Sequence, residues 1–277
     1  MSLVDRFLDY RPGNEPAHHP VLLLHGLGAS HHYWAAVAPL LAADRRVVAV
    51  DLPGFGSSPR SEVFSLERAS AQVANLVTDL GPGPCYLVGH SLGGIVALFA
   101  ARELGSSILG VVLVDAHLFT ILDVIRSPKK AFGHPRAAFS VAALISGTML
   151  PGRAELTRAT AMSSVMRRLL FWPVAYAPER LDGRLLREAF SASGSRGTLR
   201  AIAALRRVRD IDLMDVDHPF DVSIVWGRND NLITKEDSAR ATRTLRCKAA
   251  EEIPECGHWP MLEHPTVLTA VIRKLCE

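Results

Sequence analysis

Short apolar runs alternate with amphipathic stretches through the first 116 residues, and this rhythm constrains the fold more than any other feature of the sequence. The short runs are almost wholly apolar, whereas the longer stretches repeat apolar residues at helical spacing. Such alternation is typical of βαβ units, in which parallel strands form one sheet between helices. The expected strands are Val21–Leu24, Arg46–Val50, Tyr86–Val88 and Leu109–Val114, and the expected helices are Tyr33–Ala43, Ser65–Leu80 and Leu92–Leu104.

The alternation stops between residues 117 and 210 and then resumes. No β-branched run appears in that segment, and several prolines divide it into short helical pieces. Beyond it we expect strands at Val222–Trp226 and Ala249–Ile253, and helices at Lys235–Leu245 and Thr266–Leu275. A helical block between two parts of one sheet is best interpreted as an insertion. We therefore predict a core domain formed by residues 1–116 and 211–277, with residues 117–210 as an inserted helical cap.

Composition limits the class of protein. The cysteines, Cys85, Cys247, Cys256 and Cys276, are scattered and lack metal-ligand spacing, so we expect reduced thiols and no metal site. Charged residues near the N-terminus interrupt any signal-peptide core, and no apolar run reaches the roughly 18 residues of a membrane helix. The sequence therefore predicts a cytoplasmic protein without a membrane span.

The net charge of +3 is unevenly distributed along the chain. Residues 117–210 hold 16 Lys and Arg against 6 Asp and Glu. This segregation fits a basic surface that faces anionic groups, such as those of acyl-CoA or an acyl-carrier protein, or simply a solvated helical face. No pattern of interleaved aromatic residues suggests stacking on bases, so we expect no nucleic-acid partner.

The segment Gly89–Gly93 reads G-H-S-L-G and lies between an expected strand and an expected helix. This is the context in which G-x-S-x-G forms a sharp strand-to-helix turn that exposes its serine at the carboxyl edge of a sheet. The turn strains the serine backbone, and the flanking glycines leave room for the crossing. The pattern predicts Ser91 as a nucleophile, with the amide of Leu92 directed at a developing oxyanion.

A serine hydroxyl needs a base whose pKa lies near neutrality, in practice a histidine. His258 lies between the last expected strand and the last helix, from where its side chain can return to the same sheet edge. His25 and His90 lie inside glycine motifs and are expected to shape the site. Six other histidines lie in loops or helices with no strand-end placement; they are His18, His19, His31, His32, His134 and His264. His117 begins the cap, and His218 precedes a proline before the next expected strand.

The base in turn needs a carboxylate that fixes its tautomer. Asp230 follows an expected strand and lies between the serine and the histidine along the chain, in the order Ser…Asp…His of this architecture. Asp115, which ends the strand Leu109–Val114, is the rival candidate, and its alternative role is to anchor the first loop of the cap.

Two further glycine motifs follow strands. Residues 25–28 read H-G-L-G and offer a second backbone donor, the amide of Leu27, opposite that of Leu92. Gly26, His90 and Trp259 flank these groups, and we expect them to contact the substrate. Residues 51–58 read D-L-P-G-F-G-S-S, which we interpret as a structural tight turn.

Taken in order, H-G-L-G, D-L-P-G-F-G-S-S, G-H-S-L-G-G, W-G-x-x-D and G-H-W resemble the α/β-hydrolase superfamily, in the branch with a helical cap. The resemblance covers nearly the whole chain except the cap. It implies an α/β-hydrolase fold with a mostly parallel twisted sheet flanked by helices. It also implies no metal, no organic cofactor, and acyl transfer to water through an ester of the serine.

Within that superfamily, haloalkane dehalogenases and epoxide hydrolases carry an aspartate where this chain has Ser91. The stretches C-G-H-W at residues 256–259 and E-H at residues 263–264 are similar to the corresponding region of meta-cleavage-product hydrolases, which cut carbon–carbon bonds. Those enzymes usually carry Asn where this chain has His90, together with a more glycine-rich oxyanion loop. This departure makes carbon–carbon cleavage the second choice among hydrolytic reactions.

The leading hypothesis is therefore a serine hydrolase that cleaves a small or medium, largely apolar carboxylic ester. The basic cap supports an alternative, a thioesterase on acyl-CoA or acyl-carrier substrates. A natural-product-tailoring lyase or acyltransferase on the same fold, and a partner-binding relative with slow turnover, also remain open.

Overall fold

A computed structural model describes residues 7–59, 63–81, 83–117, 119–149, 152, 155, 159, 161, 163–190, 197–209 and 219–277. Among these residues, seven strands form one sheet in the order β1-β3-β2-β4-β5-β6-β7. The first strand pairs antiparallel with β3, and all other pairings are parallel. The strands are β1 Phe7–Tyr10, β2 Val21–Leu24, β3 Val47–Val50, β4 Cys85–His90, β5 Ile108–Val114, β6 Asp221–Gly227 and β7 Ala249–Ile253.

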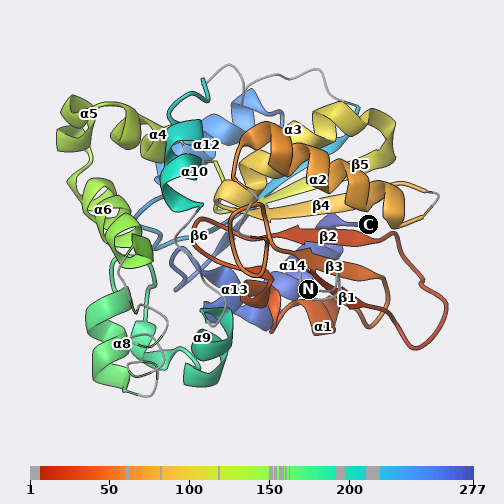
Figure 1. The fold of residues 1–277 in the computed structure, drawn as a ribbon, viewed down its shortest axis with the longest axis horizontal. Helices are drawn as coiled ribbons and strands as arrows, with labels where there is room; N and C mark the ends of the chain where they lie inside the picture. Colours follow the sequence, from red (N-terminus) through yellow and green to blue (C-terminus); the bar gives the residue numbers. More distant parts are fainter. Residues whose placement is uncertain are drawn as a thin grey trace.

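Helices cover both faces of this sheet (Figure 1). On one face α2 packs on α3, and on the other α1 packs on α14. The core helices are η2 His31–Trp34, α1 Ala38–Leu41, α2 Leu66–Asp79, α3 Leu92–Leu104, η3 Gly105–Ser107, α12 Lys235–Thr244, α13 Pro260–Glu263 and α14 Pro265–Leu275. This mostly parallel sheet between two helical layers is the expected α/β fold.

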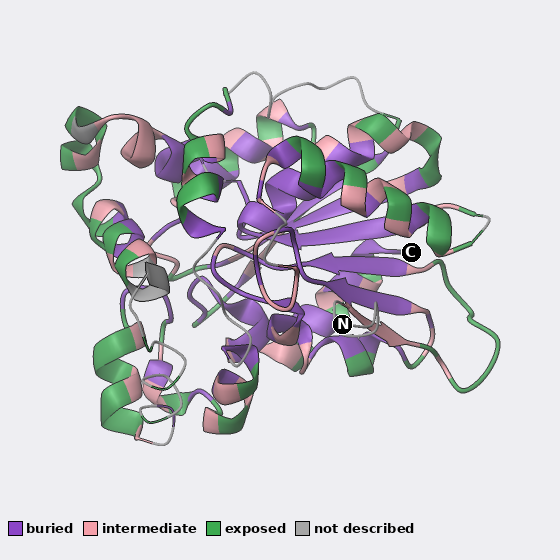
Figure 2. Ribbon diagram, in the orientation of Figure 1, coloured by how far each residue is buried: buried purple, intermediate pink, exposed green. Residues whose placement is uncertain are grey.

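The central strands form the core of the molecule (Figure 2). Every residue of β2, β3 and β4 is buried, as expected for parallel strands that are covered on both faces. The chain order reverses between β2 and β4, which lie side by side. In open α/β sheets, ligands bind outside the carboxyl ends of the strands at such a reversal. Leu27 follows β2 and Ser91 follows β4, so both lie at this position.

The described residues between Phe119 and Arg209 contain helices and no strand, and we call them the cap segment. Its helices are α4 Phe119–Arg126, α5 Pro128–Gly133, α6 Pro135–Met149, α8 Ser164–Phe171, η4 Pro178–Arg180, α9 Gly183–Ala189 and α10 Thr198–Leu205. Helices α5, α6 and α8 form one side of the molecule, at the left of Figure 1. The predicted boundary between residues 210 and 211, and His218, lie outside the described residues.

Buried polar contacts attach the start of the cap segment to α12. The Asp237 carboxylate accepts hydrogen bonds from both the backbone N–H and the hydroxyl of Thr120, each at 3.1 Å. The same carboxylate completes the capping box of α12 with Thr234. Beside it, the Nε2 atom of His117 lies 2.9 Å from the hydroxyl of Ser238. The chain therefore leaves the sheet through a fixed, buried joint.

Two elements differ from the sequence-based expectations. Strand β1 was not expected, because four half-buried residues with mixed polarity are too few to establish a period. It is held at the sheet edge by pairing with β3 and by the Asp9–Arg46 ion pair at 2.9 Å. The expected helix Tyr33–Ala43 is two short pieces, η2 and α1. Pro39 explains the break, because proline lacks the N–H that a continuous helix would need there.

Within the described residues, no helix combines the length and apolar character needed to cross a bilayer.

Candidate active site

Ser91 lies at a sharp turn between β4 and α3. Its φ of 52° falls in the left-handed region, which is strained for a residue other than glycine. A side chain on Gly89 would collide with the backbone of Gly93, and one on Gly93 would collide with the carbonyl oxygens of Leu24 and His25. The two glycines therefore permit the close crossing that the G-x-S-x-G motif predicted.

Three side chains far apart in the sequence form one hydrogen-bonded chain at this turn. The Oγ atom of Ser91 lies 3.2 Å from Nε2 of His258. The Nδ1 atom of His258 lies 2.7 Å from Oδ2 of Asp230. The side chains of His258 and Asp230 are 1% and 0% exposed, and Ser91 is 6% exposed. In such surroundings an imidazole can accept the serine proton while the carboxylate stabilises the resulting positive charge.

Glu263, a residue that sequence reasoning did not assign to the site, holds the loop of His258. Its carboxylate oxygens accept the backbone N–H groups of Gly257, at 3.1 and 3.0 Å, and of Trp259, at 3.2 Å. It also accepts the N–H of Tyr176 in the cap segment, at 2.8 Å. Burial raises the pKa of Glu263, and these N–H groups oppose that change. The only sequence signal for Glu263 is the resemblance of residues 263–264 to the corresponding region of meta-cleavage-product hydrolases.

His25 and His90 contact backbone groups of the loops around the serine. His25 donates from Nδ1 to the Gly26 carbonyl at 2.8 Å and accepts the N–H of Leu52 on Nε2 at 3.0 Å. His90 donates from Nε2 to the carbonyl of His258 at 2.8 Å. Burial lowers the pKa of both imidazoles, and the neighbouring His258 lowers that of His90 further. Both rings are therefore neutral, and their hydrogen bonds hold the loops around the serine in place.

The tight turn after β3 is structural, as interpreted from its sequence. Asp51 is fully buried, and its carboxylate accepts the N–H groups of His31, at 2.7 Å, and Ser57, at 2.6 Å. The Nδ1 atom of His31 lies 3.0 Å from the same carboxylate, a contact that its loop position did not suggest. These bonds hold the loop after β3 against η2, beside the H-G-L-G turn.

Asp115, the rival acid, lies behind Asp230 and does not contact the imidazole in its place. Its Oδ1 atom accepts the N–H of Gly227 at 3.1 Å, and its side chain is fully buried. Burial raises its pKa well above the usual range, and the charge of Asp230 raises it further. The hydrogen bond of His258 thus goes to Asp230.

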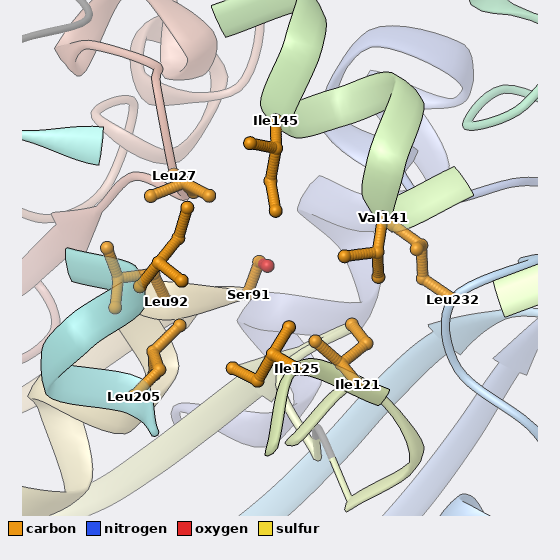
Figure 3. A pocket seen from close by; sticks show the side chains of 10 residues that line it. Leu27, Ser91, Leu92, Ile121, Ile125, Val141, Ile145, Leu205 and Leu232 are labelled. Carbon is orange, nitrogen blue, oxygen red and sulfur yellow. The ribbon is translucent and has the colours of Figure 1, made fainter. Parts of the chain in front are cut away.

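A small apolar cavity borders Ser91, and its labelled lining side chains surround the serine in Figure 3. Its volume is about 30 Å³, and Ser91 contributes its only polar side chain among the described lining residues. The apolar side chains come from the core and from α4, α6 and α10; they are Leu27, Leu92, Leu232, Ile121, Ile125, Val141, Ile145, Ile202 and Leu205. Leu27 and Leu92, the expected sources of oxyanion-binding amides, therefore both border the serine.

Gly26, His90 and Trp259 are not among the described residues that line this cavity. A side chain on Gly26 would collide with the ring of His90. Trp259 is 3% exposed and packs edge-on against Tyr33, Phe171 and Phe190, with ring centroids 6.2, 5.5 and 5.6 Å away. Their contact with a substrate stays a prediction.

Among the described residues, the one cluster of possible metal ligands is Asp115, Asp230 and His258. The 2.7 Å separation of His258 Nδ1 and Asp230 Oδ2 is that of a hydrogen bond. A zinc ion between these atoms would need about 2.0–2.2 Å to each, so this closed pair fits a shared proton better than a metal ion.

Residues 21–271 match the sequence model of the family described as "Alpha/beta hydrolase family". The chain belongs to this family. The match spans β2 to α14, including the turn at Ser91 and the loop at His258.

Several hydrolases of known function are similar to the chain. The pimeloyl-[acyl-carrier protein] methyl ester esterase of Aeromonas salmonicida is 27% identical, over 91% of this chain and 93% of that protein. The 2-hydroxy-6-oxo-2,4-heptadienoate hydrolase of Pseudomonas putida is also 27% identical, over 89% and 85%. A solved structure of a thermophilic esterase from Thermogutta terrifontis shares the fold, with a TM-score of 0.69 and 24% identity over 97% and 91%. These relatives support an enzyme of the hydrolase class.

Proposed function

We propose that this chain is a serine hydrolase that cleaves a small or medium, largely apolar carboxylic ester. The hydrogen-bonded chain of Ser91, His258 and Asp230 is the observation that carries the proposal. The resemblance to a methyl ester esterase over nearly the full length supports the ester linkage as the target.

In the proposed reaction, Ser91 Oγ bonds to the ester carbonyl carbon while its proton passes to His258 Nε2. The carbonyl electron pair moves onto oxygen, where the amides of Leu27 and Leu92 would stabilise it. Collapse of this intermediate breaks the bond to the alcohol oxygen, which takes the proton from His258. Water then adds to the acyl-serine by the same route, and the acid and free Ser91 are released.

The cavity supports an apolar acyl group. Its lining side chains, apart from Ser91, are Leu, Ile and Val, and none of those described can pair with a charge. Placing an unpaired carboxylate among them would carry a large desolvation cost. The favoured substrates are therefore neutral aliphatic esters.

The size of the cavity indicates that the cap segment moves during turnover. A volume of about 30 Å³ holds about two water molecules. An acyl chain of several carbons needs more room, which α4, α6 and α10 would supply by shifting away from Ser91. Such gating by a cap would also exclude bulk water from the acyl-enzyme.

The proposal is tested with a chain-length series of p-nitrophenyl esters on the wild type and Ser91→Ala. We expect the variant to lose turnover and to resist labelling by a fluorophosphonate probe. Ser223→Ala, which changes a buried serine of β6, is the matched control and should retain both. Turnover by Ser91→Ala at the wild-type rate would refute the proposal. Wild-type turnover far below about one per minute on every ester would favour a partner-binding protein instead.

A thioesterase on acyl-CoA or acyl-carrier substrates is the second candidate, because α10 borders both the serine cavity and a basic groove. Ile202 and Leu205 line the cavity, whereas Arg200 and Arg207 line a groove of about 490 Å³, together with one acid, Glu67. A phosphate-bearing carrier could lie in this groove with its acyl group beneath the cap segment.

Salt dependence separates the two candidates, since attraction between exposed charges weakens as the Debye length falls. A thioesterase should lose kcat/KM on acyl-CoA as salt rises, and Arg200→Gln with Arg207→Gln should lower both the activity and its salt dependence. The thioesterase candidate would be refuted if activity on acyl thioesters did not depend on salt and did not exceed the activity on neutral esters. The arginines of the groove would then contact solvent and bind no substrate.

A further inference from the structure

Two buried carboxyl groups, Asp115 and Asp230, lie together at the carboxyl ends of neighbouring strands. Asp115 follows β5 and Asp230 follows β6, and the two strands pair in parallel. Both side chains are 0% exposed. One ligating atom from each, together with a ring nitrogen of His258, lies within 4.8 Å of the others. The site therefore holds one carboxyl group more than a Ser-His-Asp arrangement requires.

The hydrogen bonds of the two groups are unequal. Asp230 accepts from His258 Nδ1 on Oδ2 and from the N–H of Leu232 on Oδ1, both at 2.7 Å. Asp115 accepts on Oδ1 from the N–H of Gly227, and its Oδ2 has no hydrogen-bond partner among the described residues. An ionised oxygen left in that state in the interior is costly. A proton on it would instead create a donor beside the carboxylate of Asp230.

Electrostatics place that proton on Asp115. Two carboxylates this close in a dry interior cannot both ionise at moderate cost, as in other acid pairs that share one proton. Asp230 is the better-stabilised anion, because it accepts two hydrogen bonds, one from the imidazole of His258 and one from the backbone N–H of Leu232. Burial and the charge of Asp230 raise the pKa of Asp115 well above its usual range.

The other titratable groups around Asp115 do not reverse this assignment. Glu263 adds a further negative charge, which also raises the pKa of Asp115. Burial raises the pKa of the Cys256 thiol, so it stays neutral. Burial lowers the pKa of the His117 imidazole to about 4, so it adds no positive charge at neutral pH. His258 makes its hydrogen bond to Asp230, not to Asp115.

We propose that Asp115 is a positioning residue, which stays protonated at neutral pH and donates a hydrogen bond to the carboxylate of Asp230. The inference rests on the proposed function, in which Asp230 orients His258. Asp115 never touches the substrate. It fixes the Asp230 carboxylate so that one oxygen faces the imidazole, and it disperses part of the charge on that carboxylate.

The backbone at Asp115 decides which variants are informative. Its φ is 44°, a left-handed conformation that Asn and Gly tolerate better than most residues. Asn also reproduces a protonated aspartate, since its oxygen can accept from Gly227 and its NH₂ can donate to Asp230. Asp115→Asn should therefore behave like the wild type, whereas Asp115→Gly keeps the backbone but removes the donor.

The first experiment is infrared spectroscopy of wild-type protein labelled with ¹³C-aspartate, which needs neither a substrate nor a variant. We expect an aspartate carbonyl stretch from a protonated carboxyl at pH 7. It should vanish in Asp115→Asn and persist in Asp237→Asn, a matched control that alters another buried aspartate whose pKa burial raises. Absence of the band from the folded wild type would overturn the proposal, whether or not the protein is a hydrolase. Loss of the band in Asp237→Asn alone would also overturn it.

The second experiment follows the pH dependence of inactivation by a fluorophosphonate. If Asp115 is neutral, Asp115→Asn should leave the acid limb of the profile within about 0.3 pH units of the wild type. Asp115→Gly should slow inactivation about tenfold, because Asp230 loses a charge-assisted hydrogen bond. Asp115→Gly should not move the acid limb of the profile to lower pH. Without the hydrogen bond from Asp115, the carboxylate of Asp230 attracts the protonated imidazole of His258 more strongly.

If Asp115 were ionised, both variants would remove a negative charge close to His258. The acid limb of the inactivation profile would then move to lower pH in both variants, by about 1 to 3 pH units. That result would overturn the proposal. A merely structural Asp115 would change the unfolding midpoint of Asp115→Gly without slowing inactivation of the folded fraction, and this would overturn it too. A wild type that reacts with no fluorophosphonate would count against the proposed function, while the infrared band would still decide the proton on Asp115.

Discussion

Both carboxylate oxygens of Glu263 accept the backbone N–H of Gly257, at 3.1 and 3.0 Å. Gly257 precedes His258, so this contact fixes the loop that presents the imidazole. The same side chain accepts the N–H of Tyr176 from the cap segment. One half-buried acid thus connects the loop of the candidate base to the cap segment.

Replacing this acid should therefore affect stability and catalysis together. We expect Glu263→Ala to lower the free energy of unfolding by about 2–4 kcal/mol, because it leaves buried N–H groups unpaired. Its kcat should fall more than its KM changes, since the loop of His258 loosens while the cavity stays apolar. Urea unfolding and steady-state kinetics check this, with Glu236→Ala as an exposed control. An unchanged kcat in a destabilised variant would show that Glu263 stabilises the fold and has no role in catalysis.

Asp230→Asn should reduce kcat about 10³–10⁴-fold with little change in stability. The amide can hold the imidazole only in the wrong tautomer, and it cannot stabilise the imidazolium. Neutral Asp115 behind it should not compensate. Ester kinetics check the loss against Asp221→Asn, which changes an aspartate at the exposed start of β6. A loss of less than about tenfold would mean that another acid serves His258.

Elements with a strong local period were predicted closely from the sequence. Helix α2 is an example: its apolar residues recur at helical spacing, and its bounds, Leu66–Asp79, differ by one residue at each end from the expected Ser65–Leu80. Strand β1 depends on pairing with β3, and the break between η2 and α1 depends on one proline. Such features are decided by tertiary contacts or single residues, which a period does not encode.

The candidate site follows the same division. Ser91, His258 and Asp230 could be proposed because chain order and strand ends limit which side chains meet at one sheet edge. The choice between Asp230 and Asp115 needed coordinates, since each follows a strand. The role of Glu263 could not be anticipated either, because it depends on three N–H groups from two distant segments converging on one carboxylate.

The apolar cavity predicts discrimination against charged acyl chains. A methyl ester of an alkanoic acid should exceed the monomethyl ester of the dicarboxylic acid of equal length by about 10²-fold or more in kcat/KM, since the second carboxylate would lose hydration without a partner. Ile125→Arg, which places a cation in the lining, should narrow this ratio. Preference of the wild type for the charged ester would show that the acyl group lies outside the cavity of Figure 3.

His117 predicts how stability depends on pH. Burial lowers its pKa from 6.5 to about 4, so the folded protein keeps this imidazole neutral where the unfolded chain binds a proton. Stability from this residue is complete above pH 6.5 and is lost as pH falls towards 4, by about 3 kcal/mol in all.

His117→Gln can still bond to Ser238 but does not titrate. Its free energy of unfolding should therefore fall less than that of the wild type between pH 7.5 and about 4.5, measured in urea. The other buried imidazoles are common to both proteins and cancel in the difference. His134→Gln, at an exposed position, should follow the wild type. Parallel curves for wild type and His117→Gln would show that His117 takes up its proton without opposing the fold.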